Sequence, residues 1–153
     1  MLEDVIKEYG GEEVTALEVY ADVFRFGEGY IQKNRSDKRQ VANPLGYYKQ
    51  DGADWGHYRI MFEDDFPQYL EELQQADFGL LNGLSYWGRK NTQQRASKLF
   101  ALIFDYDGVT DETLNNFFSG AFNVQAYPIP NYVVLSGHNC QLYYVMETPI
   151  SLY

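Results

Sequence analysis

The stretch Leu99–Leu114, LFALIFDYDGVTDETL, constrains the fold more than any other part of the sequence. Residues 98–104 form an apolar run without alternation, which is typical of a strand buried on both faces. Two carboxylates separated by one residue, Asp105 and Asp107, follow this run directly. A helix predicted over residues 111–118 comes next, with capping residues at its start. We therefore predict a buried strand that ends in two acidic side chains and leads into a short helix.

The remaining sequence predicts an α+β domain. A chain of 153 residues is the size of one ordinary domain, and an aromatic content of 17% favours a fold that contains a sheet. The chain stops directly after an apolar strand pattern without a polar tail, so we expect a piece of a longer protein. The periodicity predicts helices over 1–26, with a break at Gly10-Gly11, and over 64–78, and strands over 58–62, 132–136 and 141–146.

Targeting and redox signals are few. No segment reaches the roughly 18 apolar residues that a membrane span needs, and the N-terminal sequence is acidic, so we expect no membrane association and a cytoplasmic location. The single cysteine, Cys140, cannot form an internal disulfide, which fits a reducing compartment.

The basic residues are unevenly distributed. The net charge of -10 argues against binding of nucleic acid, but all 12 Lys and Arg residues lie between Lys7 and Lys98. They concentrate in residues 33–39 and 89–98. Ordinary solvated loops explain most clusters of this kind, and local phosphate binding is the alternative. The nucleic-acid-binding candidates are Arg89, Lys90, Arg95 and Lys98.

The acidic pair is a candidate metal site. Side chains at i and i+2 of a strand point to the same face, so Asp105 and Asp107 are expected to project together and to repel each other. A divalent cation relieves this repulsion, and carboxylate oxygens suit Mg²⁺ or Mn²⁺. The alternative is a polar strand end in which Asp107-Gly108 only makes a turn.

A second pattern, VVLSGHNCQLYYV over Val133–Val145, predicts a hairpin with a polar tip. The backbone N–H groups of a Ser-Gly turn can hold phosphate oxygens. An ordinary polar hairpin tip is the alternative. The candidate phosphate-contacting residues are Ser136, Gly137, His138, Asn139 and Gln141.

Taken together, ALIFDYDGV and VVLSGHNCQLYYV resemble the archaeo-eukaryotic primase (primase-polymerase) superfamily, as found in replication proteins of bacterial plasmids and integrative elements. The resemblance covers about the last 60 residues. It implies a sheet related to the RNA-recognition fold, with helices on one face and a helical N-terminal unit before it. Residues 1–97 would then form an N-terminal α/β unit and residues 98–153 part of the catalytic core of an N-terminal fragment.

The same resemblance implies a function in DNA replication. Asp105 and Asp107 would be catalytic and bind Mg²⁺ or Mn²⁺, and the hairpin would contact a nucleoside triphosphate during DNA-templated nucleotidyl transfer. The sequence departs from the family pattern at Asn139, where a glycine is expected, and at Gln141, where a histidine is expected. A third acidic motif has no place before Tyr153, so we expect the chain to be catalytically incomplete.

Two other interpretations remain open. The chain could be a non-catalytic remnant of the primase fold that binds DNA or protein. IFDYDGVT also resembles the first motif of haloacid-dehalogenase phosphatases, in which the first aspartate is a nucleophile. No lysine follows Lys98 to stabilise a phosphoaspartate, which disfavours the phosphatase.

Overall fold

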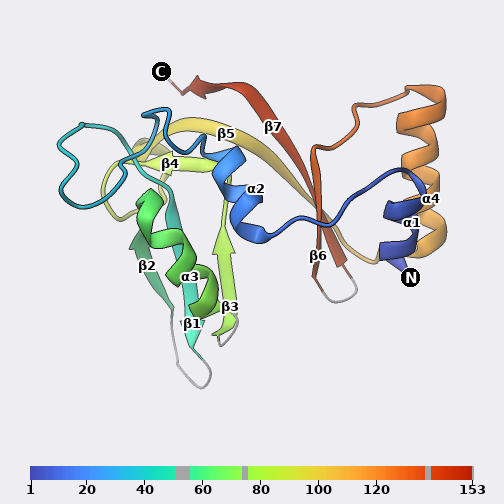
Figure 1. Ribbon diagram of the computed structural model, residues 1–153, viewed down its shortest axis with the longest axis horizontal. Helices are drawn as coiled ribbons and strands as arrows, with labels where there is room; N and C mark the ends of the chain where they lie inside the picture. Colours follow the sequence, from blue (N-terminus) through green and yellow to red (C-terminus); the bar gives the residue numbers. More distant parts are fainter. Residues whose placement is uncertain (51–55, 74–75, 137–138, 153) are drawn as a thin grey trace. The chain divides into compact units, whose positions relative to one another are not determined.

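The computed structural model describes residues 1–50, 56–73, 76–136 and 139–152, and it divides the chain into two compact units. Unit 1 comprises Met1–Val14 and Leu102–Val145, and unit 2 comprises Thr15–Ala101 and Met146–Tyr153. Figure 1 shows helices and strands in both, and the predicted α+β class is confirmed. The α-helices are α1 (Leu2–Glu8), α2 (Ala16–Val23), α3 (Phe66–Leu73) and α4 (Asp111–Ser119).

Two sheets organise the strands, in the orders β2-β1-β3 and β4-β5-β7-β6. Strand β1 pairs antiparallel with both of its neighbours. The pairs β4–β5 and β6–β7 are antiparallel as well. Strand β7 also runs antiparallel to β5. Hydrogen bonds join the start of β5 to the end of β7, at Ser97 and Leu152, and the end of β5 to the start of β7, at Asp105 and Gln141. The strands are β1 (Leu45–Gln50), β2 (His57–Ile60), β3 (Ala76–Leu81), β4 (Leu84–Tyr86), β5 (Ala96–Tyr106), β6 (Tyr132–Ser136) and β7 (Asn139–Ser151).

The core of unit 1 forms where α1 and α4 pack side by side against the sheet (Figure 1). Leu114 of α4 is fully buried, and Cys140 and Leu142 of β7 join the same apolar cluster. The hydroxyl of Tyr9 donates a hydrogen bond of 3.0 Å to Asn115 Oδ1, which ties the residue after α1 to α4. These contacts fix the helix that follows the acidic strand end.

The core of unit 2 is built on phenylalanine rings. Phe24, Phe66 and Phe100 are fully buried, and the Phe24 ring lies 5.1 Å from Phe100 and 5.8 Å from Phe66. Helix α3 covers the β2-β1-β3 sheet, and the Tyr69 ring passes over Gly46 so closely that a Cβ there would lie 2.7 Å from it. A glycine is therefore required at this point of β1.

Most predicted elements are present, with different ends. The predicted helix over 1–26 is two helices, α1 and α2. The predicted helix over 64–78 starts with a 3-10 turn, η1 (Glu63–Asp65), and continues as α3, but its last residues belong to β3 because the sheet offers Ala76–Leu81 a pairing partner in β1. In the described part of the chain, no helix has the length and apolar character needed to cross a membrane.

Candidate functional site

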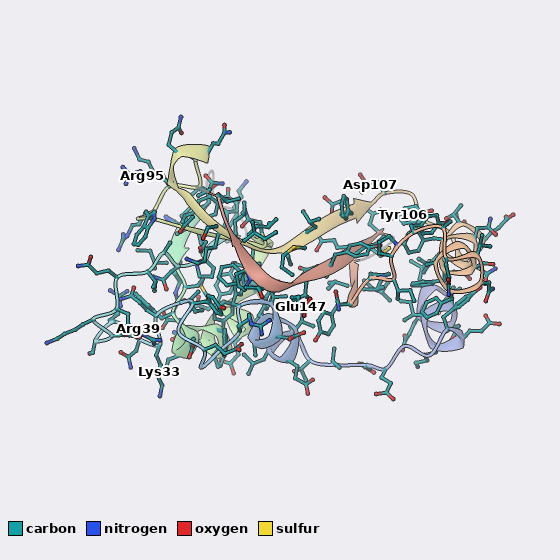
Figure 2. All side chains as sticks on the ribbon, turned by 90° about the horizontal axis from the view of Figure 1, so that it is seen from above. Lys33, Arg39, Arg95, Tyr106, Asp107 and Glu147 are labelled. Carbon is teal, nitrogen blue, oxygen red and sulfur yellow. The ribbon has the colours of Figure 1, made fainter. Side chains whose placement is uncertain are left out.

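The acidic pair lies at the end of β5 in unit 1. Asp105 is the penultimate residue of the strand, and Asp107 lies in the turn directly after it (Figure 2). Tyr106, between them, points to α4, since its ring lies 6.3 Å from Phe117. Because neighbouring strand residues alternate, Asp105 faces away from α4. Both carboxylates are exposed to solvent.

The turn after β5 has a fixed path. Gly108 has a φ of 66°, in the left-handed region that favours glycine. Val109 is buried in the core of unit 1, and Thr110 then caps α4 in a reciprocal pair of hydrogen bonds with Thr113. This cap was predicted from the sequence, with Thr110 or Asp111 as the capping residue. The turn is therefore held on both sides of Gly108.

The hairpin lies beside the acidic strand end. Gln141 Nε2 donates a hydrogen bond of 2.9 Å to Asp105 Oδ1, and the backbone N–H of Gly108 donates one of 3.1 Å to Asn139 Oδ1. These bonds join two sequence motifs that are more than 30 residues apart. Ser136 pairs with Asn139 at the end of β6, whereas Gly137 and His138 lie outside the described residues.

The two residues that depart from the primase pattern thus have partners inside the protein. The predicted phosphate contacts of Asn139 and Gln141 stay predictions, and in the structure Asn139 binds the turn at Gly108 and Gln141 binds Asp105 at the strand end. An amide that donates to a carboxylate makes a charge-assisted hydrogen bond, which orients the carboxylate. Sequence reasoning did not foresee either bond, because both depend on the pairing of β5 with β7.

Cys140 lies between these two residues but takes no part in polar chemistry. Its side chain is 1% exposed and belongs to the apolar cluster beneath the hairpin. Burial raises the pKa of the Cys140 thiol. The thiol therefore stays protonated near neutral pH and acts as a packing group.

The electrostatics of unit 1 favour a bound cation. Unit 1 contains nine Asp and Glu residues and one Lys or Arg residue, Lys7, which pairs with Glu3 at 3.0 Å. Within the described residues, neither Asp105 nor Asp107 has an ion-pair partner, and Asp107 has no hydrogen bond.

The described residues limit which metal ion this region could hold. The described residues contain no group of three or more His, Cys, Asp or Glu side chains that could hold a metal. A protein cage for zinc is therefore not formed by these residues. Mg²⁺ binds through as few as one or two carboxylates, with water and substrate phosphates in its other positions, so Asp105 and Asp107 are the candidate ligands in unit 1.

The predicted nucleic-acid-binding residues all belong to unit 2. Arg89 and Lys90 follow β4, Arg95 ends the 3-10 turn η2 (Gln93–Arg95), and Lys98 lies on β5. The first three are exposed, and the backbone N–H of Trp87 donates a hydrogen bond of 2.9 Å to the Arg95 carbonyl. A backbone hydrogen bond therefore closes the β4–β5 hairpin at the point where these basic residues lie.

Comparison with known proteins gives one structural likeness. No protein-family model and no curated protein matches the sequence. A solved structure described as the AEP domain of the primase-polymerase (PrimPol) of cyanophage S-2L aligns with a TM-score of 0.47 and 10% sequence identity. The alignment covers 89% of this chain, which spans 63% of the cyanophage chain. A TM-score below 0.5 does not establish a common fold.

Proposed function

We propose that unit 1 binds a nucleoside triphosphate together with Mg²⁺ or Mn²⁺, and that this site serves nucleotidyl transfer in the DNA replication of a mobile element. The observation that carries the proposal is the hydrogen bond between Gln141 and Asp105, since it unites the acidic strand end with the hairpin that the sequence assigns to phosphates. Nucleotidyl transfer is proposed because the two sequence motifs resemble those of the primase-polymerase superfamily.

Each residue of the site has a role in this proposal. Asp105 and Asp107 would hold the metal, and Gln141 would keep one Asp105 oxygen oriented while the other oxygen remains available. Asn139 would fix the position of Gly108 and thereby the direction of Asp107. A bound divalent ion supplies Lewis-acid polarisation of a phosphoryl oxygen and offsets the negative charge of unit 1.

Glutamine at position 141 limits what the site can do. Its amide donates a hydrogen bond, but it carries no positive charge and exchanges no proton near neutral pH. Gln141 therefore helps to bind phosphate and to orient Asp105. Any proton transfer would have to involve another group or solvent. A non-catalytic nucleotide-binding module is consistent with the same geometry, and turnover distinguishes it from an enzyme.

The phosphatase interpretation receives no support from the geometry. Phosphatases of this type use a lysine, in addition to the metal, to stabilise the phosphoaspartate, and Lys7, the one lysine of unit 1, is engaged by Glu3. The partners of β5 are antiparallel strands, so β5 is not part of a parallel sheet that collects ligands at the carboxyl ends of its strands.

The test is metal-dependent nucleotide binding by the whole chain. We expect a fluorescent ATP analogue to bind in the presence of Mn²⁺. This binding should be lost when EDTA removes the metal. Asp105→Asn should lower the affinity at least about 10-fold, because it removes a charged ligand with little change in shape. The control is Glu12→Gln, which changes the charge of unit 1 by the same amount at another exposed position.

The outcomes separate the alternatives. Nucleotide binding that is independent of metal and unchanged in Asp105→Asn would overturn the proposal. Binding of beryllofluoride without nucleotide would indicate the phosphatase. Metal-dependent nucleotide binding without template-directed incorporation would identify the non-catalytic module.

A further inference from the structure

Unit 2 contains a cleft that the acidic site does not use. Its volume is about 350 Å³, near the lower end of the range for small-ligand pockets. All of its lining residues belong to unit 2. Three arginines and three rings account for most of the lining: Arg35, Arg59, Arg89, His57, Tyr58 and Phe62.

Two of the three arginines carry charge that the described residues do not neutralise. Arg59 pairs with Glu72 at 2.9 Å and lies 3.9 Å from Asp65, so its charge is used within the fold. Arg35 and Arg89 have no ion-pair partner among the described residues, and both are exposed. Among the described residues, no carboxylate competes with an incoming anion for these two guanidinium groups.

The rings of the cleft add flat apolar surface next to these charges. Tyr58 lies on the edge strand β2, is 41% exposed and has its ring 5.1 Å from that of Tyr47. The Arg35 guanidinium carbon lies 5.9 Å from the centre of the Phe62 ring, which holds the charge near the cleft wall. An exposed tyrosine beside uncompensated arginines is the combination that binds a base and its phosphates.

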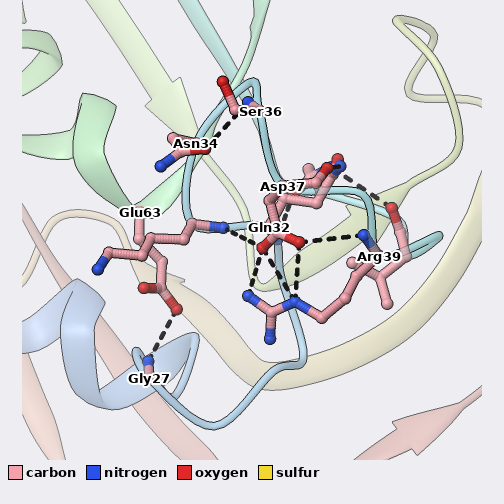
Figure 3. A network of polar contacts seen from close by, with 10 residues as sticks. Gly27, Gln32, Asn34, Ser36, Asp37, Arg39 and Glu63 are labelled. Carbon is pink, nitrogen blue, oxygen red and sulfur yellow. Dashed lines mark hydrogen bonds and ion pairs between the residues drawn. The ribbon is translucent and has the colours of Figure 1, made fainter.

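The loop that carries Arg35 is ordered by its own polar contacts (Figure 3). The Asp37 carboxylate accepts hydrogen bonds from the backbone N–H groups of Lys33 and Arg39 and pairs with the Arg39 side chain. Asn34 Oδ1 accepts a bond of 2.9 Å from the Ser36 N–H, across Arg35. Such a preformed loop lowers the entropy that binding would otherwise cost.

We propose that this cleft, here called the Arg35–Arg89 cleft, binds single-stranded nucleic acid. Tyr58 stacks on a base, and Arg35 and Arg89 contact the flanking phosphates. Stacking and phosphate contact are independent of base sequence, so the cleft takes strands of any composition. This inference does not depend on the nucleotide site of unit 1, and it adds Arg35 and Tyr58 to the cationic cluster around Arg89.

The test measures binding of fluorescein-labelled dT20 to the full chain by fluorescence anisotropy from 25 to 200 mM salt. We expect Arg35→Ala/Arg89→Ala to weaken binding at least 10-fold at low salt. The slope of log affinity against log salt should also fall by about 1.4, because each lost phosphate contact on single strands removes about 0.7. Lys7→Ala/Lys38→Ala, which removes two exposed charges outside the cleft, is the control.

A second pair of variants tests the ring. Tyr58→Ala should weaken dT20 binding at least about 5-fold at every salt concentration without a change in the salt slope, since base stacking is not ionic. Tyr58→Phe keeps the ring and should bind like the wild type. Circular dichroism establishes that each variant is folded, and Arg35→Lys/Arg89→Lys should retain most of the salt slope.

The proposal fails if the wild-type chain does not bind dT20 at 25 mM salt, or if the control weakens binding as much as the arginine variant. Equal affinity for double-stranded DNA and dT20, with no effect of Tyr58→Ala, would also overturn it in favour of a nonspecific polyanion surface. The nucleotide-binding measurement on the same samples reports separately on unit 1, so the two proposals fail independently.

Discussion

The two units of this chain differ sharply in charge. Unit 1 holds one of the 12 Lys and Arg residues and nine of the 22 acidic residues, whereas unit 2 holds the other 11 basic and 13 acidic residues. A phosphate approaching unit 1 meets an excess of carboxylates, which in the proposed function a metal ion offsets. A phosphate approaching unit 2 finds Arg35 and Arg89, which have no ion-pair partner among the described residues. The total of -10 therefore conceals two surfaces with different chemistry.

The difference extends to the packing of the two cores. Unit 1 is held by aliphatic and aromatic contacts between α1, α4 and the sheet, and unit 2 by a cluster of phenylalanine rings. If each proposed site depends on the core beneath it, substitutions in one core should disturb mainly the site in that unit. The following predictions test this separation.

The largest effect is expected for Phe66→Ala in unit 2. The ring is fully buried against Phe24 and Phe26, so its removal should lower the free energy of unfolding by about 3–5 kcal/mol. Urea denaturation measures this loss. Phe122→Ala, at a ring that is 37% exposed, is the control and should cost clearly less. Equal losses would show that the phenylalanine cluster is not the core of unit 2.

Leu114→Ala should come next, with a loss of about 2–5 kcal/mol in unit 1. Leu114 is fully buried between α4 and β7, and Asn116 on the same helix is exposed and serves as the control site. Hydrogen exchange should accelerate in α1 and α4 before it does so in β1 and β2. Uniform acceleration through both units would contradict the separation.

Asn139→Ala tests the support of the acidic turn. The variant leaves the Gly108 N–H without its side-chain acceptor, at a cost of about 1 kcal/mol, so metal-dependent nucleotide affinity should fall about 5-fold. Asn123→Ala, at an exposed amide that bonds Ser119, should not change the affinity. An unchanged affinity in Asn139→Ala would remove Asn139 from the site.

The smallest effect concerns Asp37. The hydrogen bonds from the Arg39 side chain and from the Lys33 and Arg39 backbone lower the pKa of its carboxyl well below the ordinary 3.8. A lowered folded-state pKa contributes stability that is present above pH 4 and is lost as the pH falls through the folded value. Asp37→Asn should therefore flatten the fall in melting temperature between pH 4 and pH 2. A curve identical to that of the wild type would contradict this role.

The sequence predicted the local features of the candidate site better than its contacts. The strand before Asp105, the cap at Thr110 and the strand over 132–136 follow from short-range patterns, and the structure contains each of them. The prediction that residues 98–104 are buried on both faces is wrong for Leu102 and Phe104, which are 43% and 51% exposed. The Gln141–Asp105 bond requires β7 to lie beside β5, and strand order is not encoded in local periodicity. The predicted helix also ran too far past Leu73, because pairing with β1 decides the structure of 76–81.

The Arg35–Arg89 cleft was missed for the same reason. Both basic clusters were visible in the sequence, but nothing local shows that residues from 33–39 and 89–98 line one cavity with Tyr58. The signal that could have directed attention to it is the excess of Lys and Arg over acidic residues, four against one in 33–39 and four against none in 89–98. The spatial arrangement is needed to tell which cations are already paired, as Arg59 is.

The most direct test of the central claim titrates one set of samples with two ligands, an Mn²⁺-loaded fluorescent ATP analogue and labelled dT20. We predict that Asp105→Asn/Asp107→Asn loses nucleotide binding and keeps dT20 binding, whereas Arg35→Ala/Arg89→Ala shows the opposite loss. Loss of both ligands in both variants, or no loss of nucleotide binding in the aspartate variant, would contradict the assignment of metal-bound nucleotide to unit 1 and of the strand to unit 2.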